Sequence, residues 1–272
     1  MMKDALGDRQ KSYEAIESGR ILMPNLPIIA RLDGRAWHTF CKGLERPYDI
    51  RLSSLMAKTS KFLAEQTNAL ISYTQSDEIT LVLFKDTIES QVFFGGRVQK
   101  LNSIFASMAT AYFNKHLEAH LPEKKDKMPL FDCRIWNVPS LEEASENLLW
   151  RELDATKNSI SMAAQAYYSH KELHGKNGSE KQEMLFKKGI NWDKYPAFFK
   201  RGSYFRRVNK FVKFTTEEIN KLPMKHEARK IPNLMVERSL VEGVEFPPLN
   251  KVANKVDVLF FGATPSKKEA SS

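Results

Sequence analysis

A polar turn interrupts a long run of strand-forming residues in the stretch ALISYTQSDEITLVLF, residues 69–84. The β-branched and aromatic side chains on both sides of the turn favour two strands. Ser76 and Asp77 are residue types that favour a tight turn. We therefore predict a β-hairpin that carries Asp77 and Glu78 at its turn.

Another carboxylate stands at the end of a second apolar stretch. Pro27-Ile28-Ile29-Ala30 predicts a strand, and Arg31-Leu32-Asp33-Gly34-Arg35 follows it directly. Carboxylates at strand ends rarely serve packing, because an unpaired buried charge costs more than an apolar side chain would gain. Hard divalent cations prefer oxygen ligands. Asp33 and Asp77 are therefore candidate Mg²⁺ ligands.

Two helices and a fourth strand complete the predicted fold. Asp49 is a candidate N-cap for a helix that reaches Thr67, and apolar residues recur at helical spacing from Val92 to His120. Residues 130–136 predict a short strand. The order strand, helix, strand, strand, helix, strand is typical of the ferredoxin-like α+β fold.

This topology predicts that the two aspartates meet. A right-handed crossover makes the first two strands parallel, and the third strand fills the gap between them. Asp33 and Asp77 then share one sheet edge, where two Mg²⁺ ions about 3.5–4 Å apart would suit an in-line displacement on a nucleotide. Gly34 would let a metal ion or phosphate approach the backbone, with Glu78 in support. The alternative is that Asp77 and Glu78 form only a solvated turn.

The excess positive charge is confined to one segment. The chain of 272 residues has a net charge of +9, from 42 basic and 33 acidic residues. Residues 187–230 contain 13 Lys or Arg against 4 Asp or Glu, which accounts for the whole excess. Such a segment indicates a polyanionic partner such as tRNA. Its aromatic residues would stack on bases or, more commonly for a strand, pack in the core. The basic residues at its centre are Lys200, Arg201, Arg206, Arg207, Lys210 and Lys213.

The cysteine content and hydropathy of the sequence indicate a reducing compartment outside the membrane. Cys41 and Cys133 are the only cysteines, and neither has the sequence context of a catalytic nucleophile. The sequence contains no apolar run of membrane-spanning length and no signal peptide. We therefore expect a cytoplasmic protein.

Several separated motifs resemble the tRNA-histidine guanylyltransferase superfamily, whose members are 3′-to-5′ nucleotide polymerases with a palm fold. The similarity runs from Leu6 to about Arg207, and residues 168–176 (YSHKELHGK) resemble the bacterial and phage-type branch of guanylyltransferase-like proteins. The motifs are residues 33–40 (DGRAWHTF), 76–78 (SDE), 94–100 (FGGRVQK), 150–155 (WRELDA) and 188–192 (KGINW).

The resemblance implies a Mg²⁺-dependent nucleotidyltransferase that uses ATP and GTP as substrates and tRNA as partner. Asp33, the Gly34 carbonyl and Asp77 would hold two Mg²⁺ ions, with Glu78 beside them. ATP would adenylylate the tRNA 5′-monophosphate, and the 3′-hydroxyl of an incoming nucleotide would attack this activated end. The candidate nucleotide-binding residues are Arg35, Ala36, Trp37, His38, Ser76, Arg97, Lys100 and Ser103, and the candidate tRNA-binding residues are Asn158, Lys181, Lys200, Arg201, Arg206 and Arg207.

The resemblance also implies a homo-oligomer, with a tetramer as its typical form, and the sequence itself suggests two domains. We expect a palm-like catalytic domain over residues 1–137 and a C-terminal domain over residues 138–262. The latter would append an α-rich region and the basic segment to the palm. Residues 263–272 are polar and predict a disordered tail.

One difference from the family leaves the preferred tRNA open, and two other functions remain as alternatives. The stretch Thr156-Lys157-Asn158-Ser159 keeps Asn158 but lacks the His that accompanies it in eukaryotic enzymes specific for histidine tRNA. This difference favours templated repair of 5′-truncated tRNAs over a strict preference for histidine tRNA. A palm-type nucleotide cyclase and a non-catalytic RNA-binding module are the alternatives, and the paired carboxylates argue against the second.

Overall fold

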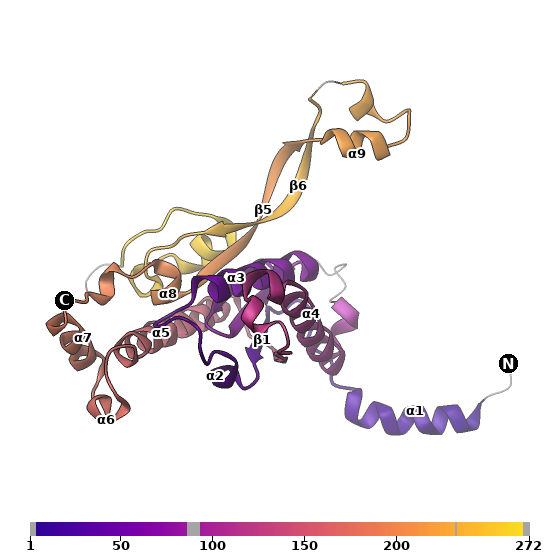
Figure 1. Cartoon of the computed structure of the whole chain (residues 1–272). Helices are drawn as coiled ribbons and strands as arrows, with labels where there is room; N and C mark the ends of the chain where they lie inside the picture. Colours follow the sequence, from indigo (N-terminus) through magenta and orange to yellow (C-terminus); the bar gives the residue numbers. More distant parts are fainter. Residues whose placement is uncertain (1–3, 86–92, 232, 269–272) are drawn as a thin grey trace.

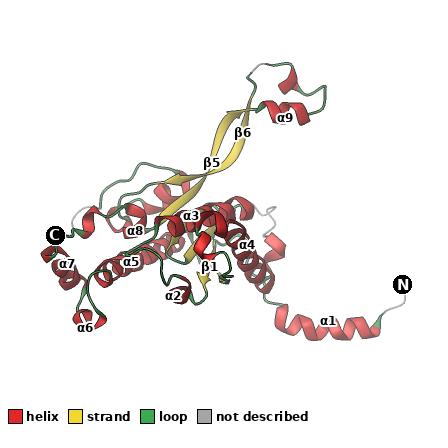
Figure 2. Cartoon of the chain, viewed as in Figure 1, coloured by secondary structure: helices red, strands yellow, loops and turns green. Residues whose placement is uncertain are grey.

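The structure is a computed structural model that describes residues 4–85, 93–231 and 233–268. It is a mixed α+β protein built on one sheet (Figures 1 and 2). The strands are β1 (Ile28–Gly34), β2 (Ile71–Gln75), β3 (Glu78–Leu83), β4 (Phe131–Asn137), β5 (Ser203–Lys213) and β6 (Met235–Val244). The α-helices are α1 (Ala5–Ser18), α2 (Trp37–Phe40), α3 (Ile50–Thr67), α4 (Val98–His120), α5 (Leu141–Gln165), α6 (His170–Leu173), α7 (Gly178–Lys187), α8 (Ala197–Arg201) and α9 (Thr216–Lys221).

The six strands form an antiparallel sheet in the order β4-β1-β3-β2-β5-β6. As the sequence predicted, β3 lies between β1 and β2 and returns from β2 by a tight turn. The register pairs Asp33 of β1 with Glu78 of β3 on one side and with Asp132 of β4 on the other. Three acidic residues therefore stand in one row across the sheet, on a shared face.

Helices cover both faces of the central strands. Ala30 and Leu32 of β1 pack with apolar residues of α3 and α4 in one core cluster. Ile29 of β1 points to the opposite face and packs with Ala144 and Leu148 of α5. This alternation follows from the two-residue period of a strand. It places Arg31 and Asp33 on the α5 face, together with Ile29.

The helices of the central unit begin where local chemistry allows. The Asp49 carboxylate accepts a hydrogen bond from the Arg51 amide, so it caps α3 as predicted. Helix α4 begins at Val98, later than the predicted Val92, which lies outside the described residues. Gly95 and Gly96 precede it with φ of 62° and 71°, in the left-handed region that ends or delays a right-handed helix.

The C-terminal half contributes strands as well as the expected helices. Helices α5, α7 and α8 enclose a third core cluster, whereas β5 and β6 extend the same sheet from β2. Only the first residues of β5 pair with β2. The rest of β5 and β6 forms a two-stranded ribbon that projects from the body and carries α9 near its tip (Figure 1).

The chain ends contact the body to different degrees. Helix α1 buries none of its residues and extends away from the rest of the molecule (Figure 1). Of the predicted disordered tail, Ser266 and Lys268 form backbone hydrogen bonds with Ala253 and Lys251, and residues 269–272 lie outside the described chain. In the described ranges, no helix is long and apolar enough to cross a membrane.

Candidate active site

Asp33 and Asp77 meet at one edge of the sheet, as predicted. Asp33 is the second-last residue of β1, and Asp77 lies in the two-residue turn between β2 and β3. The Gly34 amide donates a hydrogen bond of 3.1 Å to the Asp77 carbonyl, which ties the two strand ends together.

Close packing around Gly34 holds this arrangement in place. A side chain at residue 34 would collide with the Trp37 ring and approach the Asp77 Cβ to 3.0 Å. The Trp37 ring is held by Phe113 and Phe131, so it has no room to yield. The site therefore requires glycine at position 34 because of space, in addition to any approach of a ligand.

Two residues beside the aspartates have unusual backbone conformations. Ala36 and Ser76 both have a φ of 54°, in the left-handed region that costs a non-glycine residue roughly 1 kcal/mol. Ser76 opens the turn that presents Asp77, and Ala36 precedes α2. Such conformations persist only where surrounding structure imposes them, and they concentrate at functional sites.

The electrostatics of the site favour an added cation. Burial, followed by the neighbouring charge of Asp33, raises the pKa of Asp77 to about 6. Glu78 adds a third negative charge beside this pair. A carboxylate held among like charges is destabilised unless a cation joins it, and this is the arrangement expected of metal ligands.

Glu78 differs from the two aspartates because it has an internal partner. Both of its carboxylate oxygens accept hydrogen bonds from Arg151 of α5, at 2.6 Å and 2.8 Å. Arg151 also bonds Asp154 at 3.1 Å. Burial raises the pKa of Glu78, and the Arg151 guanidinium opposes this rise. The geometry suits a positioning residue that fixes the turn, rather than a free metal ligand.

A cavity of about 380 Å³ opens between the carboxylates and α5. It is lined by Asp33, residues 75–78 of the hairpin turn, and Arg151, Asn158, Ser161, Met162 and Gln165 of α5. We call it the carboxylate cavity. The candidate tRNA-binding residue Asn158 thus lies at the predicted catalytic site, where its amide donates to Asp154.

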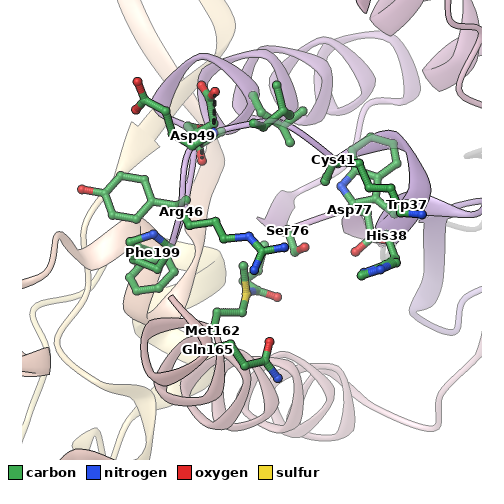
Figure 3. Close-up of a pocket in the computed structure, with 18 of the residues that line it drawn as sticks. Trp37, His38, Cys41, Arg46, Asp49, Ser76, Asp77, Met162, Gln165 and Phe199 are labelled. Atoms are coloured by element: carbon green, nitrogen blue, oxygen red, sulfur yellow. Dashed lines mark hydrogen bonds between the residues drawn. The ribbon is translucent and has the colours of Figure 1, made fainter. Parts of the chain in front are cut away.

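A larger cavity of about 820 Å³ adjoins it, and the two share Gln75, Ser76, Asp77, Met162 and Gln165. We call this one the large cavity. In Figure 3, Met162 and Gln165 of α5 form one wall, His38 and Asp77 lie across from them, and the Arg46 side chain reaches into the space. Further lining residues with basic side chains are Lys42, His170, His174 and Lys181, and Glu45 and Asp49 are acidic.

The candidate nucleotide-binding residues after Asp33 lie in different surroundings. The Arg35 amide donates to the Leu130 carbonyl at 2.8 Å, so it is already occupied. Trp37 is buried among aromatic rings and exposes only an edge to the large cavity. His38 is exposed and lines that cavity.

Arg97, Lys100 and Ser103 are not brought to the aspartates within this chain. They occupy the first turns of α4, next to Arg20 and Ile21. The part of α4 that reaches the Asp33 end is Phe113, which contacts Trp37. Ten residues of helix separate Ser103 from Phe113, about 15 Å. Neither cavity is lined by these three candidate residues.

Most of the predicted tRNA-binding cations have partners inside the protein. Lys200 is 8% exposed and bonds Asp193. Arg206 donates to the Val258 carbonyl, and Arg207 donates to carbonyls of α3 and the following turn. Lys181 lines the large cavity and bonds Ser161, while the Arg201 carbonyl accepts from Tyr73. Several basic residues of this segment therefore stabilise the fold, which a count of charged residues along the sequence does not reveal.

Sequence reasoning missed Arg151 and Arg46. Arg151 lies in the motif WRELDA, but nothing in the sequence indicates that its partner is Glu78, 73 residues earlier. Arg46 precedes a proline in a loop, with no periodic signal. The cysteines agree with expectation, since burial raises the pKa of Cys41 to about 11 and of Cys133 to about 12, and both remain thiols at neutral pH.

The donor set at the carboxylate cavity fits magnesium. No group of three or more His, Cys, Asp or Glu side chains with metal-binding geometry occurs in residues 4–85, 93–231 and 233–268. Mg²⁺ is commonly held by one or two carboxylates together with substrate phosphates and water, and so it does not need a third side chain. Asp33 and Asp77 are two carboxylates that line one cavity, and they suit this requirement.

Comparison with known proteins agrees with this geometry. A model of the family described as tRNAHis guanylyltransferase matches residues 7–139. The tRNA(His) guanylyltransferase of Neurospora crassa is 30% identical over 227 residues, which cover 77% of this chain and 75% of the relative. The chain belongs to the tRNA(His) guanylyltransferase family.

Other members of the family show similar relationships. The Saccharomyces cerevisiae tRNA(His) guanylyltransferase is 30% identical, over 72% of this chain and 89% of the yeast protein. A bacterial tRNA(His) guanylyltransferase-like protein in complex with ATP has 39% identity and a TM-score of 0.71, over 74% of this chain and 88% of its own. Such a protein in complex with GTP has 31% identity and a TM-score of 0.70, over 91% and 95%.

Proposed function

We propose that this protein is a nucleotidyltransferase that adds nucleotides to the 5′ end of tRNA in the 3′-to-5′ direction. The observation that carries the proposal is the meeting of Asp33 and Asp77 at the carboxylate cavity, which adjoins the large cavity, in a family of tRNA(His) guanylyltransferases. The related solved structures bind ATP and GTP, which supports the same nucleotides as substrates here. The strand order around β1–β4 supports a palm of ferredoxin-like type.

The large cavity suits the nucleotide. Its volume of about 820 Å³ lies within the range of small-molecule sites, about 300–1,000 Å³. His38, Arg46 and Lys181 would neutralise phosphates, because charge-assisted hydrogen bonds are the usual means of holding them. Asp77 lines this cavity as well as the carboxylate cavity, so the nucleotide's phosphates would reach the aspartates.

The proposed reaction has two group transfers. The tRNA 5′-phosphate attacks the α-phosphorus of ATP, forming a 5′-adenylylated tRNA and releasing pyrophosphate. The 3′-hydroxyl of GTP then attacks the tRNA 5′-phosphorus, loses its proton and displaces AMP, which leaves a new 5′-triphosphate. Mg²⁺ held by Asp33, Asp77 and the Gly34 carbonyl would stabilise the charge that develops on the phosphate oxygens. Arg151, through Glu78, would hold the turn that carries Asp77 in position.

The preferred RNA is the second part of the proposal. The segment around Asn158 lacks the His of the eukaryotic enzymes, so we propose that 5′-truncated tRNAs are extended against the opposite strand as template. A tRNA substrate would place the activity in the cytoplasm. Assembly into a homo-oligomer stays a prediction.

The test uses two 5′-monophosphorylated tRNAs with the protein, ATP, GTP and Mg²⁺. One is histidine tRNA without its extra guanosine, and the other is a tRNA that lacks its first paired nucleotide. Stronger extension of the truncated tRNA on a sequencing gel supports repair, and the reverse supports dedicated guanosine addition. Extension of neither, with nucleotide consumed in the absence of RNA, would refute the proposal in favour of a cyclase.

A further inference from the structure

An exposed tryptophan lies beside the active site and has no place in the function described so far. Trp150 of α5 is 51% exposed. The guanidinium carbon of Arg151 lies 4.5 Å from its ring centroid, and that of Arg31 lies 5.7 Å away. The large aromatic ring of Trp150 therefore lies near two guanidinium groups and is open to solvent rather than packed in the core.

A third arginine extends the same surface. Arg134 of β4 stands directly opposite Arg31 of β1 in the sheet register, so the two side chains share the α5 face. Like charges that face each other across strands are destabilising, which favours an anion between them. The Arg134 side chain is 55% exposed and its contact with Asp132 is long, at 3.6 Å. We call Trp150, Arg31 and Arg134 the Trp150 platform.

The platform is close to the aspartates. Arg31 precedes Asp33 by two residues on the same face of β1, a separation of about 7 Å. Arg151, under the Trp150 ring, also holds Glu78. Along α5, Trp150 lies eight residues from Asn158 and fifteen from Gln165, about 12 Å and 22 Å. The large cavity, the carboxylate cavity and the platform thus follow one another along one helix.

We propose that the Trp150 platform binds an unpaired nucleotide of the RNA substrate next to its 5′ end. The base stacks on Trp150, and Arg31 and Arg134 bind the adjoining phosphates. Unpaired bases are recognised in this way by aromatic rings and guanidinium planes, and stacking on one aromatic ring changes affinity by about 5- to 100-fold. This proposal rests on the proposed function. The large cavity already accounts for the free nucleotide, so we assign the platform to the RNA.

The test compares two RNA hairpins that share a 5′-phosphorylated stem. One has single-stranded nucleotides at its 3′ end, and the other is blunt. The unsubstituted protein should bind the overhanging hairpin more tightly. Trp150→Leu should lose this preference, with a drop of about 10-fold or more for the overhanging hairpin only. Trp150→Phe should keep most of it. Phe186→Leu, which removes another exposed aromatic ring, is the matched control and should change neither affinity.

Two further measurements keep the proposal falsifiable if Trp150→Leu unfolds. The overhanging hairpin should quench the tryptophan fluorescence of the unsubstituted protein more than that of Trp150→Phe. Arg134→Gln should weaken binding of the overhanging hairpin several-fold and lower the salt dependence of its affinity. Equal quenching in Trp150→Phe, or unchanged salt dependence in Arg134→Gln, would overturn the platform.

The outcomes separate the platform from the proposed function. If the unsubstituted protein adds nucleotides and Trp150→Leu still prefers the overhanging hairpin, the platform is overturned and the proposed function stands. Overhang-dependent binding that is lost in Trp150→Leu, in a protein that extends no RNA, would support the platform and overturn the proposed function. A change of molecular mass by light scattering in Trp150→Leu, with both RNA affinities unchanged, would show a contact between copies instead.

Discussion

The N-terminus of α3 and the turn between β2 and β3 each place an aspartate on the wall of the same large cavity, yet the two carboxylates differ. Asp49 is 4% exposed, caps α3 and forms a 2.7 Å ion pair with Arg51, which holds its pKa below the ordinary range. Asp77 lies among the charges of Asp33 and Glu78, and its pKa is raised to about 6. One acid is satisfied by its own helix, whereas the other is arranged for a cation from outside. This difference separates a structural carboxylate from the one that we propose as a metal ligand.

The strongest way to test this comparison is Asp77→Asn. Loss of a metal ligand should reduce nucleotide addition by more than about 100-fold, since even groups that only orient ligands are worth 10- to 100-fold. The same change should raise the free energy of unfolding by about 1–2 kcal/mol, because it removes a buried charge beside Asp33. Gel-resolved tRNA extension and urea unfolding measure the two effects.

Glu118→Gln is the matched control for Asp77→Asn. Glu118 is an exposed acid on α4 that lines neither cavity, so both activity and stability should be unchanged. An Asp77→Asn protein that extends tRNA as fast as this control would refute the assignment of Asp77 as a metal ligand.

Arg151→Leu breaks the ion pair of Arg151 with Glu78 and the longer one with Asp154. It leaves the half-buried Glu78 carboxylate without its bidentate partner, so unfolding free energy should fall by about 2–3 kcal/mol. Nucleotide addition should fall about 10- to 100-fold as the turn that carries Asp77 loosens.

The double variant Arg151→Leu with Glu78→Gln separates these two effects. Removing the unpaired charge should restore stability without restoring nucleotide addition. Thermal unfolding and single-turnover extension check the two expectations, and recovery of both would mean that Arg151 acts through stability alone.

Asp49→Ala should affect the fold more than the chemistry. Loss of the α3 cap should lower unfolding free energy by about 1–2 kcal/mol, whereas nucleotide addition by folded protein should fall less than about threefold. Because the folded pKa of Asp49 is depressed, its contribution is present above the ordinary value of 3.8 and is lost as pH falls further. The stability difference between Asp49→Ala and the unsubstituted protein should therefore shrink below about pH 4 in acid titrations of urea unfolding. Asp49→Asn, which retains a capping oxygen, should lose less stability at neutral pH.

The smallest effect is expected on the ribbon. Lys210 and Glu242 form a 2.6 Å ion pair, with side chains 51% and 39% exposed. Solvent screens such a pair, so Glu242→Gln should change unfolding free energy by less than about 0.5 kcal/mol. A larger loss of unfolding free energy, measured by urea unfolding, would mean that exposed and buried acidic residues of this protein differ less in their contribution to stability than we infer.

Sequence patterns predicted the elements that depend on nearby residues. The Asp49 cap needs only Arg51, two residues away, and the hairpin turn is built from Ser76 and Asp77 themselves. The helix that we predicted to begin at Val92 begins at Val98. The spacing of apolar residues did not reveal this, because it does not register the two glycines whose left-handed backbone precedes the helix.

Contacts between distant segments were not predictable in the same way. Arg207 donates hydrogen bonds to backbone carbonyls of α3 and of the turn after it, more than 130 residues earlier in the chain. The count of basic residues along the sequence had placed it in a tRNA-binding segment. Lys100 and Ser103 lie in the first turns of α4 and Arg97 is its N-cap, so packing of α4 leaves all three at the end away from Asp33.

The sequence by itself determined the strand ends, the caps and the meeting of Asp33 with Asp77, because short-range hydrogen bonds and strand topology follow from local residue order. Only the tertiary structure decided which acids find partners. In the folded protein Arg151 forms an ion pair with Glu78, whereas Asp77 lies beside Asp33. The two cavities and Trp150 lie along α5. The physical reason is that the state of a charge depends on what burial brings near it, and burial is set by the packing of the whole chain.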